Sequence, residues 1–500
     1  MADRRPTPID PSGELRGLAG DCVHCGFCLP ACPTYQLWGE EMDSPRGRIH
    51  LMTQILDGTA GTAATATHLD RCLGCMACVT ACPSGVRYDR LIEAARGWAE
   101  EQPAWPASGA SPPGPGGGRP PAEQHPLPAR SLRERALRAA IFRVFPYPRR
   151  LRAAIAPLRA VQRAGIDRLI DRSGLADQLA PEIASALRLA PASPPVPSGP
   201  WRRRAATRRG ASPRGATRSA ATPSGADPFS RPHAVLPGRV PARGTRRAVV
   251  GMLTGCVQRV FFPQVNAATA NVLAAEGCDV IIPAGQGCCG ALSLHGGRRA
   301  EAARFARQAI ETFERAGVDA IVVNVAGCGS AMKEYRDLLA DDAGWSNRAA
   351  ALASKVRDFS EFLVELGPVA VRQPLDVTVA YHAACHLAHA QRITAQPRDL
   401  LGAIPGLRLT DIADGGTCCG SAGIYNLVQP EPARELGERK AAAVAATGAG
   451  LLVSANPGCA MQIASALAAR GTQMPMAHIA EVLDASIRGT AVSTLLARLG

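Results

Sequence analysis

The sequence predicts an α+β protein of several domains, in which a helical, cysteine-rich N-terminal domain precedes two repeated α/β modules. Three observations lead to this fold class. Two cysteine runs of identical spacing lie in the first hundred residues, another cysteine pattern repeats across the C-terminal half, and a segment rich in proline, glycine and arginine separates the halves. A chain of 500 residues is long enough for about three domains, and its hydrophobic content of 46% suffices for their cores.

The N-terminal cysteine runs are DCVHCGFCLPACPTY, which begins at residue 21, and RCLGCMACVTACPS, which begins at residue 71. Each has the spacing C-x2-C-x2-C-x3-C-P, which is typical of loops that bind a [4Fe-4S] cluster. Zinc is usually bound by two separated pairs of ligands, and cysteines this close together could close only small, strained disulfide loops. No apolar run follows the N-terminal arginines, so no secretory signal peptide is indicated.

The two runs together predict two [4Fe-4S] clusters that exchange their fourth ligands. In two-cluster ferredoxins the last cysteine of each run binds the cluster of the other run. The first cluster is therefore expected to be bound by Cys22, Cys25, Cys28 and Cys82, and the second by Cys72, Cys75, Cys78 and Cys32. A helical apolar pattern from Ile49 to Ile55 separates the runs, so we expect a helical two-cluster domain over residues 1–100.

Residues 101–245 are expected to be a linker. Its two ends are rich in proline, glycine or arginine and are too poor in apolar residues to form a core. Between them, residues 131–190 have the pattern of basic amphipathic helices, which could pack on the chain's own domains, on a partner or on an anionic membrane surface. Much of the net charge of +14 lies in this linker without a nucleic-acid-binding motif, so no nucleic acid partner is expected.

The C-terminal half contains an internal repeat. The segments TGCVQ, GQGCCGAL and VAGCGSAM recur as HAACHLAH, GTCCGSAG and NPGCAMQI, with offsets of 129 to 131 residues between their cysteines. The cysteines of the first copy are Cys256, Cys288, Cys289 and Cys328, and those of the second are Cys385, Cys418, Cys419 and Cys459. So steady an offset predicts two homologous modules, over residues 246–372 and 373–500. Strand-like runs such as DVIIP alternate with helical stretches, which predicts mostly parallel sheets.

The module cysteines are candidates for a further metal site. The first and last cysteine of each module follow apolar runs, at the strand ends where open α/β sheets place their binding sites. Gly290 and Gly420 follow the adjacent cysteine pairs and indicate tight turns that direct both thiols at one object. Each set could therefore bind an iron-sulfur cluster or zinc, and the alternative is a scaffold whose cysteines bind nothing.

Histidines near these cysteines distinguish the two modules. His382, His386 and His389 lie near Cys385, whereas the first module has only His295 near its adjacent cysteine pair. The second module is therefore the better candidate for a metal site, with a histidine as an additional ligand. For each histidine taken singly, a hydrogen-bonding structural role is the expected alternative to metal ligation.

The repeated modules resemble the cysteine-rich CCG domains of the heterodisulfide reductases. Joined to an N-terminal two-cluster domain, they resemble the iron-sulfur subunits of glycolate oxidase, also called glycolate dehydrogenase. The matching segments are TGCVQRVFFPQVNAATANVLAAEG, QGCCGALSLHGG, YHAACHLAHAQRI and CCGSAGIYNLVQPE. The resemblance implies an electron-transfer subunit without catalytic residues of its own, with FAD and the substrate on flavoprotein partner subunits. No glycine motif for nucleotide binding follows a strand-like run, which agrees with this division of labour.

The sequence departs from the heterodisulfide reductase type at one position in each module. There the module ends in C-x-x-C, whereas Ala331 and Gln462 stand here at the positions of the fifth cysteine. A five-thiolate cluster is therefore not expected. Cys278 has no counterpart in the second module and is expected to be a small buried side chain.

The resemblance implies that electrons from the oxidation of glycolate to glyoxylate pass from a flavoprotein through two clusters to a membrane quinone. No stretch of eighteen consecutive apolar residues occurs, so we expect a cytoplasmic protein that is peripheral on the inner face of the cell membrane. One alternative is the iron-sulfur subunit of a lactate or glycerol-3-phosphate dehydrogenase. Another is a thiol/disulfide oxidoreductase in which the modules themselves react, against which the absent fifth cysteines argue. A zinc-stabilised assembly scaffold would leave the eight N-terminal cysteines unexplained.

Overall fold

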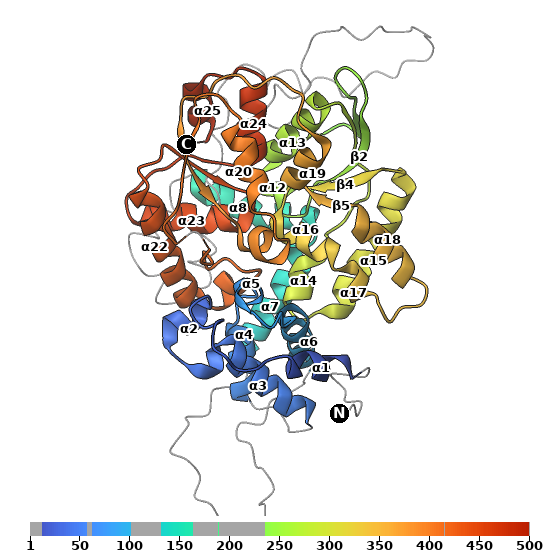
Figure 1. Ribbon diagram of the computed structural model, residues 1–500, viewed down its shortest axis with the longest axis vertical. Helices are drawn as coiled ribbons and strands as arrows, with labels where there is room; N and C mark the ends of the chain where they lie inside the picture. The colour runs from blue at the N-terminus through green and yellow to red at the C-terminus, as the bar shows by residue number, and fades with distance from the viewer. Residues whose placement is uncertain are drawn as a thin grey trace, which may run out of the picture.

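A helical N-terminal domain lies at one end of the molecule, and two α/β modules lie beside each other on top of it (Figure 1). The computed structural model describes residues 13–57, 63–101, 132–163, 189, 236–414 and 416–499. The predicted fold class is confirmed, since a helical N-terminal domain precedes two repeated α/β modules. Among the described residues, no helix has the length and apolar character needed to cross a membrane.

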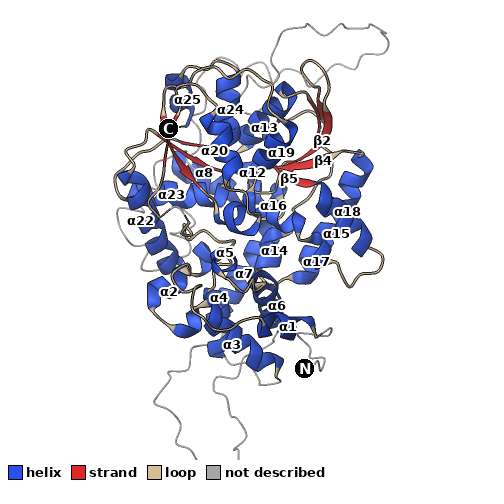
Figure 2. Cartoon of the chain, viewed as in Figure 1, coloured by secondary structure: helices blue, strands red, loops and turns tan. Residues whose placement is uncertain are grey.

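The N-terminal domain consists of helices and loops (Figure 2). Its elements are α1 (Glu14–Gly20), α2 (Pro33–Trp38), η1 (Glu41–Asp43), α3 (Pro45–Leu56), α4 (Ala63–Arg71), α5 (Ala77–Ala81) and α6 (Tyr88–Glu101). Helix α2 begins directly after Cys32, because Pro33 occupies the first helical position, where its missing N–H is not needed. The cysteines of the first run therefore lie in a loop between α1 and α2, whereas the second run includes the short helix α5, which carries Cys78.

A buried charge network holds these helices together. The guanidinium of Arg48 donates hydrogen bonds to the backbone oxygen of His68 at 2.7 Å and to Oγ1 of Thr34 at 3.1 Å. It also pairs with the carboxylate of Asp43, which accepts a second hydrogen bond from Arg71 at 2.8 Å. Breaking such a buried pair by removing one partner typically costs about 3–5 kcal/mol. The network thus fixes α3 against α4 beside the second cysteine run.

The linker helices pack on the chain's own modules. They are α7 (Leu132–Val144) and α8 (Pro148–Arg163). Phe142 lies in an apolar cluster with Leu427 of the second module, and Leu151 lies in another with Val260 of the first module. The sequence left open whether these helices pack on the chain's own domains, on a partner or on a membrane. In the described part of the linker, they pack on the chain's own modules.

The two modules have the same sheet topology. The strands are β1 (Arg239–Val240), β2 (Ala248–Leu253), β3 (Cys278–Ile281), β4 (Ala320–Val323), β5 (Val356–Asp358), β6 (Thr378–His382), β7 (Arg408–Thr410), β8 (Leu451–Ser454) and β9 (Met476–Ala477). The sheet orders are β1-β3-β2-β4-β5 and β7-β6-β8-β9. Every pairing except β1 with β3 is parallel. Without β1 the two orders are equivalent, so the sequence repeat is also a repeat of topology.

Strand β1 lies before residue 246, in the segment expected to be linker. It pairs antiparallel with β3, with Arg239 opposite Ile281 and Val240 opposite Val280. The expectation was wrong for these residues because a two-residue strand is too short to carry an alternating pattern. Residues 102–131, 164–188, 190–235 and 415, in which most of the basic low-complexity sequence falls, lie outside the described residues.

Helices cover the two sheets and join them through a common core. Those of the first module are α12 (Gln258–Phe261), α13 (Pro263–Ala275), α14 (Ala291–His295), α15 (Arg299–Ala316), α16 (Ala326–Lys333), α17 (Tyr335–Leu338), α18 (Ser346–Lys355) and α19 (Phe359–Leu366). Those of the second are η3 (His386–Ala390), α20 (Ala395–Gly402), α21 (Tyr425–Val428), α22 (Pro430–Ala446), α23 (Pro457–Ala469), α24 (Ile479–Ile487) and α25 (Val492–Leu499). Val250 of β2, Leu273 of α13, Val379 of β6 and Leu483 of α24 belong to one buried cluster. The two modules therefore share a hydrophobic core.

The turns after the adjacent cysteines have the backbone conformation expected from the sequence. Gly290 and Gly420 have φ of 86° and 89°, in the left-handed region that favours glycine. A Cβ atom on Gly420 would lie 2.6 Å from the backbone oxygen of Ala433. Glycine is therefore required at Gly420 both by its backbone angle and by the close approach of α22.

Replacement of Gly420 by alanine is expected to destabilise the protein more than replacement of Gly423. Both glycines have positive φ, but a Cβ atom on Gly423 would meet no atom within 4 Å. Gly423→Ala therefore carries only the backbone strain, whereas Gly420→Ala adds an overpacking cost of about 1–3 kcal/mol. Thermal unfolding of the two variants compares these costs directly. Equal melting temperatures would contradict the close packing at Gly420.

Candidate metal centres

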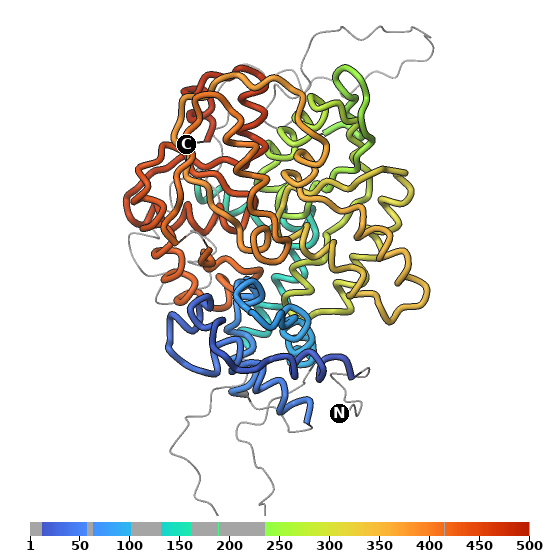
Figure 3. Tube along the Cα trace, viewed as in Figure 1, coloured from blue at the N-terminus to red at the C-terminus, as the bar shows by residue number. Residues whose placement is uncertain are grey.

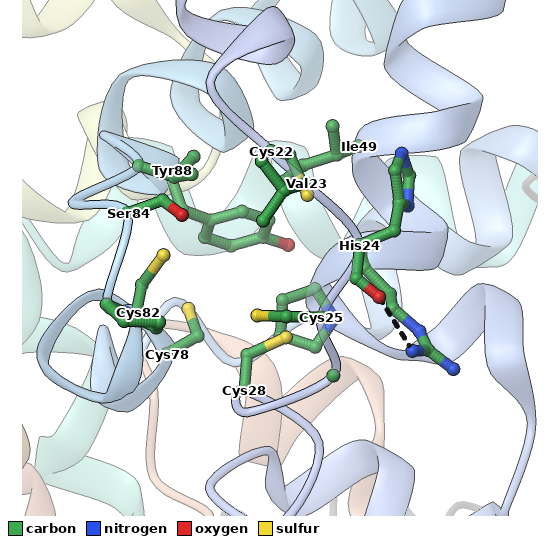
Figure 4. A pocket seen from close by; sticks show the side chains of 15 residues that line it. Cys22, Val23, His24, Cys25, Cys28, Ile49, Cys78, Cys82, Ser84 and Tyr88 are labelled. Atoms are coloured by element: carbon green, nitrogen blue, oxygen red, sulfur yellow. Dashed lines mark hydrogen bonds between the residues drawn. The ribbon is translucent and has the colours of Figure 1, made fainter.

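The eight N-terminal cysteines line two neighbouring cavities. One cavity is lined by Cys22, Cys25, Cys28, Cys82 and Cys78 (Figure 4). The other is lined by Cys32, Cys72, Cys75 and, again, Cys78. The last cysteine of each run thus joins the first three cysteines of the other run, which is the arrangement expected for exchanged fourth ligands.

The two ligand loops have the same backbone conformation around their second cysteine. The residues before and after it have positive φ in both runs, namely His24 at 54°, Gly26 at 84°, Gly74 at 63° and Met76 at 62°. Left-handed residues at these positions bend the chain twice within seven residues. Three thiols of one run can therefore point into the same cavity, as a cuboidal cluster requires.

The two cavities differ in exposure. Cys25 is exposed and its three partners in the first set are partly buried, whereas all four cysteines of the second set are buried. Val23 and Phe27, beside the first cavity, are each 67% exposed. The first cavity therefore has exposed apolar side chains beside it, and the second is lined by buried cysteines.

Burial and charge set the protonation of the second set. Burial raises the pKa of Cys75 and of Cys78 well above the ordinary value. Burial acts in the same direction on Cys72, but the charges of Arg48 and Arg96 hold the pKa of Cys72 below its ordinary value. The N–H of Gly74 also donates to Sγ of Cys72 at 3.3 Å. These thiols fit a bound cluster, because iron supplies the positive charge that buried thiolates need.

The structure also brings together the four cysteines of each module. In the first module, Sγ of Cys256 lies 3.6 Å from Sγ of Cys288. Each sulfur interacts with the next in the series Cys256, Cys288, Cys289 and Cys328, and likewise in the series Cys385, Cys418, Cys419 and Cys459. Mutual hydrogen bonding and burial raise the pKa of the Cys256 and Cys385 thiols well above the ordinary value. Both sets are convergent, as the positions at strand ends suggested.

The histidines near the second set have different surroundings. The ligand atoms of His382, Cys419 and Cys459 lie within 4.8 Å of one another, and all three residues are buried. Nδ1 of His386 lies 3.5 Å from Sγ of Cys385. His389 instead contacts Oγ1 of Thr80 at 2.8 Å, in the N-terminal domain. His382 is thus the histidine best placed to bind a metal together with the cysteines. His389 instead connects the second module to the N-terminal domain.

The positions of the absent fifth cysteines are filled by other contacts. Ala331 is buried in the first module. In the second module, Nε2 of Gln462 donates to the backbone oxygen of Ala433 at 2.8 Å, and Oε1 of Gln462 accepts from Asn426 at 3.2 Å. A five-thiolate site is therefore excluded at both positions. Cys278 is fully buried in β3, as expected.

The second cysteine set of the N-terminal domain lies against the cysteine set of the second module. Cys75, Cys385 and Cys418 belong to one buried apolar cluster, together with Leu73 and Tyr425. In Figure 3 the trace of the N-terminal domain accordingly runs directly beneath the second module. The cysteines of the first module belong to a separate cluster. Sequence analysis missed this proximity, because no local pattern records which loops meet.

Comparisons with known proteins place all three regions in one family. The description "4Fe-4S dicluster domain" matches residues 19–86, "Glycolate oxidase iron-sulfur subunit, linker region" matches residues 133–190, and "Cysteine-rich domain" matches residues 250–333 and 379–464. The chain is 35% identical to the probable glycolate oxidase iron-sulfur subunit of Bacillus subtilis, over 93% of both chains. It is 34% identical to the glycolate oxidase iron-sulfur subunit of Escherichia coli, over 91% of both chains.

A second group of relatives covers only part of the chain. Lactate utilization protein A of Shouchella clausii is 34% identical over 47% of this chain and 98% of its own length. The resemblance seen in the sequence is thus confirmed by relatives that match almost the whole chain. With its dicluster domain, linker region and paired cysteine-rich domains, the chain belongs to the family of glycolate oxidase iron-sulfur subunits.

Proposed function

We propose that the chain is the electron-transfer subunit of a flavin-dependent dehydrogenase that oxidises glycolate to glyoxylate. The observation that carries this proposal is the pair of adjoining cysteine-lined cavities, in a chain that aligns over 93% of its length with a glycolate oxidase subunit. When bound, two [4Fe-4S] clusters would carry single electrons from a flavoprotein partner towards a membrane quinone. A peripheral position at the inner face of the cell membrane would suit that acceptor.

We propose the ligand sets that the cysteine spacing predicts, and the two cavities support them. The first cluster is bound by Cys22, Cys25, Cys28 and Cys82, and the second by Cys72, Cys75, Cys78 and Cys32. Hydrogen bonds to Sγ of Cys72 from Gly74 and from the hydroxyl of Tyr88, at 3.5 Å, disperse negative charge on the sulfur. The exposed first cavity, with Val23 and Phe27 around it, suits contact with the partner that delivers electrons.

The partner is expected to carry FAD. Oxidation of a 2-hydroxy acid removes two electrons together, whereas the thiol-bound clusters accept one at a time. A flavin exchanges electrons singly or in pairs and so connects the two reactions. Glycolate is favoured over lactate as the substrate, because the glycolate oxidase subunits match 91–93% of the chain and lactate utilization protein A matches 47%.

The iron content of full-length protein tests the ligand assignment. Protein purified without oxygen should contain about eight irons in the N-terminal domain, as two clusters of four. Cys25→Ser should lose about half of them, because one cluster lacks a ligand. Cys278→Ala is the matched control, since Cys278 is fully buried in a strand away from all the cysteine sets. Stoichiometric zinc with no iron would contradict the assignment.

We also propose that the second module binds an iron-sulfur cluster or zinc. The ligands are Cys385, Cys418, Cys419 and Cys459, with His382 as a further donor. The set Cys256, Cys288, Cys289 and Cys328 is the weaker candidate, because the described residues around it include no histidine grouped with the cysteines.

Substitution of Cys459 tests the site in the second module. Cys459→Ser in the full chain should lower the total metal content and the melting temperature together, because metal binding contributes to folding. Cys328→Ser, the equivalent change in the first module, should change the metal content less. If both variants lose less than about a tenth of an equivalent of metal, the modules bind no metal and serve as a scaffold.

Reduction by substrate tests the overall function. With the flavoprotein subunits of its complex present, glycolate should bleach the visible absorption of the clusters without added reductant. The flavin would take two electrons from glycolate and pass them singly to the clusters. Without those subunits the chain alone should show no bleaching. Stopped-flow spectroscopy with glycolate and lactate compares the two substrates. Faster bleaching by lactate than by glycolate would contradict the proposed substrate and favour lactate.

A further inference from the structure

Two titratable side chains meet where the N-terminal domain contacts the first module, and a third carboxyl group lies near enough for the charge of one of them to act on it. We call Glu93 of α6, His295 of α14 and Glu334, which follows α16, the junction triad. Nδ1 of His295 lies 3.2 Å from Oε1 of Glu93, and the two side chains are only 15% and 12% exposed. Oε1 of Glu334 accepts a hydrogen bond from Oγ of Ser330 at 3.0 Å. None of the three lines the cysteine cavities described above.

The charged groups around the triad come from several elements. They are Asp89, Arg90 and Arg96 on α6, Arg299 on α15, Asp337 on α17 and His386 on η3. Arg90 pairs with Asp337 at 3.1 Å, and Arg299 donates to the backbone oxygen of Asp337 at 3.1 Å. Within the described part of the chain, neither glutamate forms an ion pair with an arginine or lysine. The arginines around the triad therefore act on Glu93 from a distance and not through a direct ion pair.

Two buried histidine nitrogens beside the glutamates have no hydrogen-bond partner. They are Nε2 of His295 and Nε2 of His386. The two rings lie 5.0 Å apart, centroid to centroid, and His386 as a whole is only 8% exposed. Unpaired buried nitrogen atoms are costly, so they indicate a site for a proton or a water molecule between the domains. This observation is independent of the two carboxyl groups.

The protonation of the triad follows from its burial. Burial raises the pKa of Glu93 to about 7, and the charge of Asp89 adds to this shift. Burial, and next the charge of Glu93, raise the pKa of Glu334 well above its ordinary value. Burial, and next the charge of Arg96, lower the pKa of His295 to about 4. Near neutral pH the histidine is therefore neutral and Glu93 changes its protonation, while the raised pKa of Glu334 favours its protonated form.

One guanidinium connects the triad with the second cysteine set. Nη1 of Arg96 donates to the backbone oxygen of His295 at 3.1 Å, and Nη2 donates to the backbone oxygen of Cys72. The charge of Arg96 acts on the Cys72 thiol and on Glu93 alike. Negative charge added at the second cavity therefore weakens the positive field that keeps Glu93 ionised.

We propose that the pair Glu93 and Glu334 takes up one proton when the cluster bound by Cys72 gains one electron. The electron comes from the reduced flavin of the partner, and the proton passes from solvent to a carboxyl oxygen of the pair. On reoxidation both leave again, so charge balances and no other bond is made or broken. The pair is thus a redox-linked proton site. This inference rests on the proposed function, which supplies the cluster.

Redox titration of the full-length, iron-loaded protein tests the proposal. Dithionite reduction is followed by electron paramagnetic resonance at several pH values, about one unit either side of the Glu93 pKa of about 7. The signal that persists in Cys25→Ser identifies the second cluster. Its midpoint potential should fall as pH rises, with a slope approaching one proton per electron, because reduction favours the protonated pair. Glu93→Gln should remove most of this slope.

Glu481→Gln is the matched control. Burial raises the pKa of Glu481 to about 7 as well, but this residue lies on α24, at the other end of the molecule from the N-terminal domain (Figure 1). Glu481 is part of a capping box with His478, where glutamine can replace glutamate. The slope should therefore be unchanged in Glu481→Gln.

Ser330→Ala provides a second variant that keeps both carboxyl groups. Its hydroxyl favours the ionised form of Glu334, so its loss should move the pH-dependent range to higher pH without abolishing it. A wild-type potential independent of pH, or equal slopes in Glu93→Gln and Glu481→Gln, would overturn the proton site. Absence of any reducible cluster signal would instead overturn the cluster assignment and the inference with it.

Discussion

The contact between the second cysteine run and the second module is the constraint on which the other sites depend. Cys75 shares an apolar cluster with Cys385 and Cys418, so the loop that carries one set of thiols forms a wall of the other set. The N-terminal domain cannot move away without exposing these thiols to water. The burial of the cysteines in the second cavity therefore follows from domain docking as much as from the loop itself.

The buried charged groups around this contact are of two kinds, those with a direct partner of opposite charge and those without one. Arg48 is fully buried, but Asp43 and backbone oxygens satisfy its guanidinium, so it stabilises the N-terminal domain and the ionised form of Cys72. Among the described residues, Glu93 and Glu334 form no ion pair with an arginine or lysine, and burial raises their pKa values. A satisfied buried pair resists a change of protonation, whereas an unsatisfied one changes protonation readily. The first arrangement suits a structural support and the second suits proton exchange.

The two modules show how a repeated site acquires different surroundings. Their strand orders and cysteine turns are equivalent, so the local geometry of the thiols is similar. Their surroundings differ, because the second set adjoins the N-terminal domain and has His382 beside it, whereas the first set lies in the core of its own module. Local geometry thus follows from the repeat, whereas the surroundings depend on what each copy contacts.

The sequence by itself determined the features that depend on neighbouring residues or on the repeat. Only the tertiary structure decided which of the predicted loops contact one another. The cysteine spacing predicted that the last cysteine of each run lies beside the other run, and the constant offset predicted the paired sheets, because each property is set by nearby residues or by the repeat. Strand β1 escaped prediction because two residues carry no periodicity. Glu93 and His295 are 202 residues apart in sequence, yet they are in contact. Hydrophobic periodicity identifies the buried face of a helix, but it carries no information about which other element covers that face. The protonation of Glu93 therefore depends on burial that only the packed domains create.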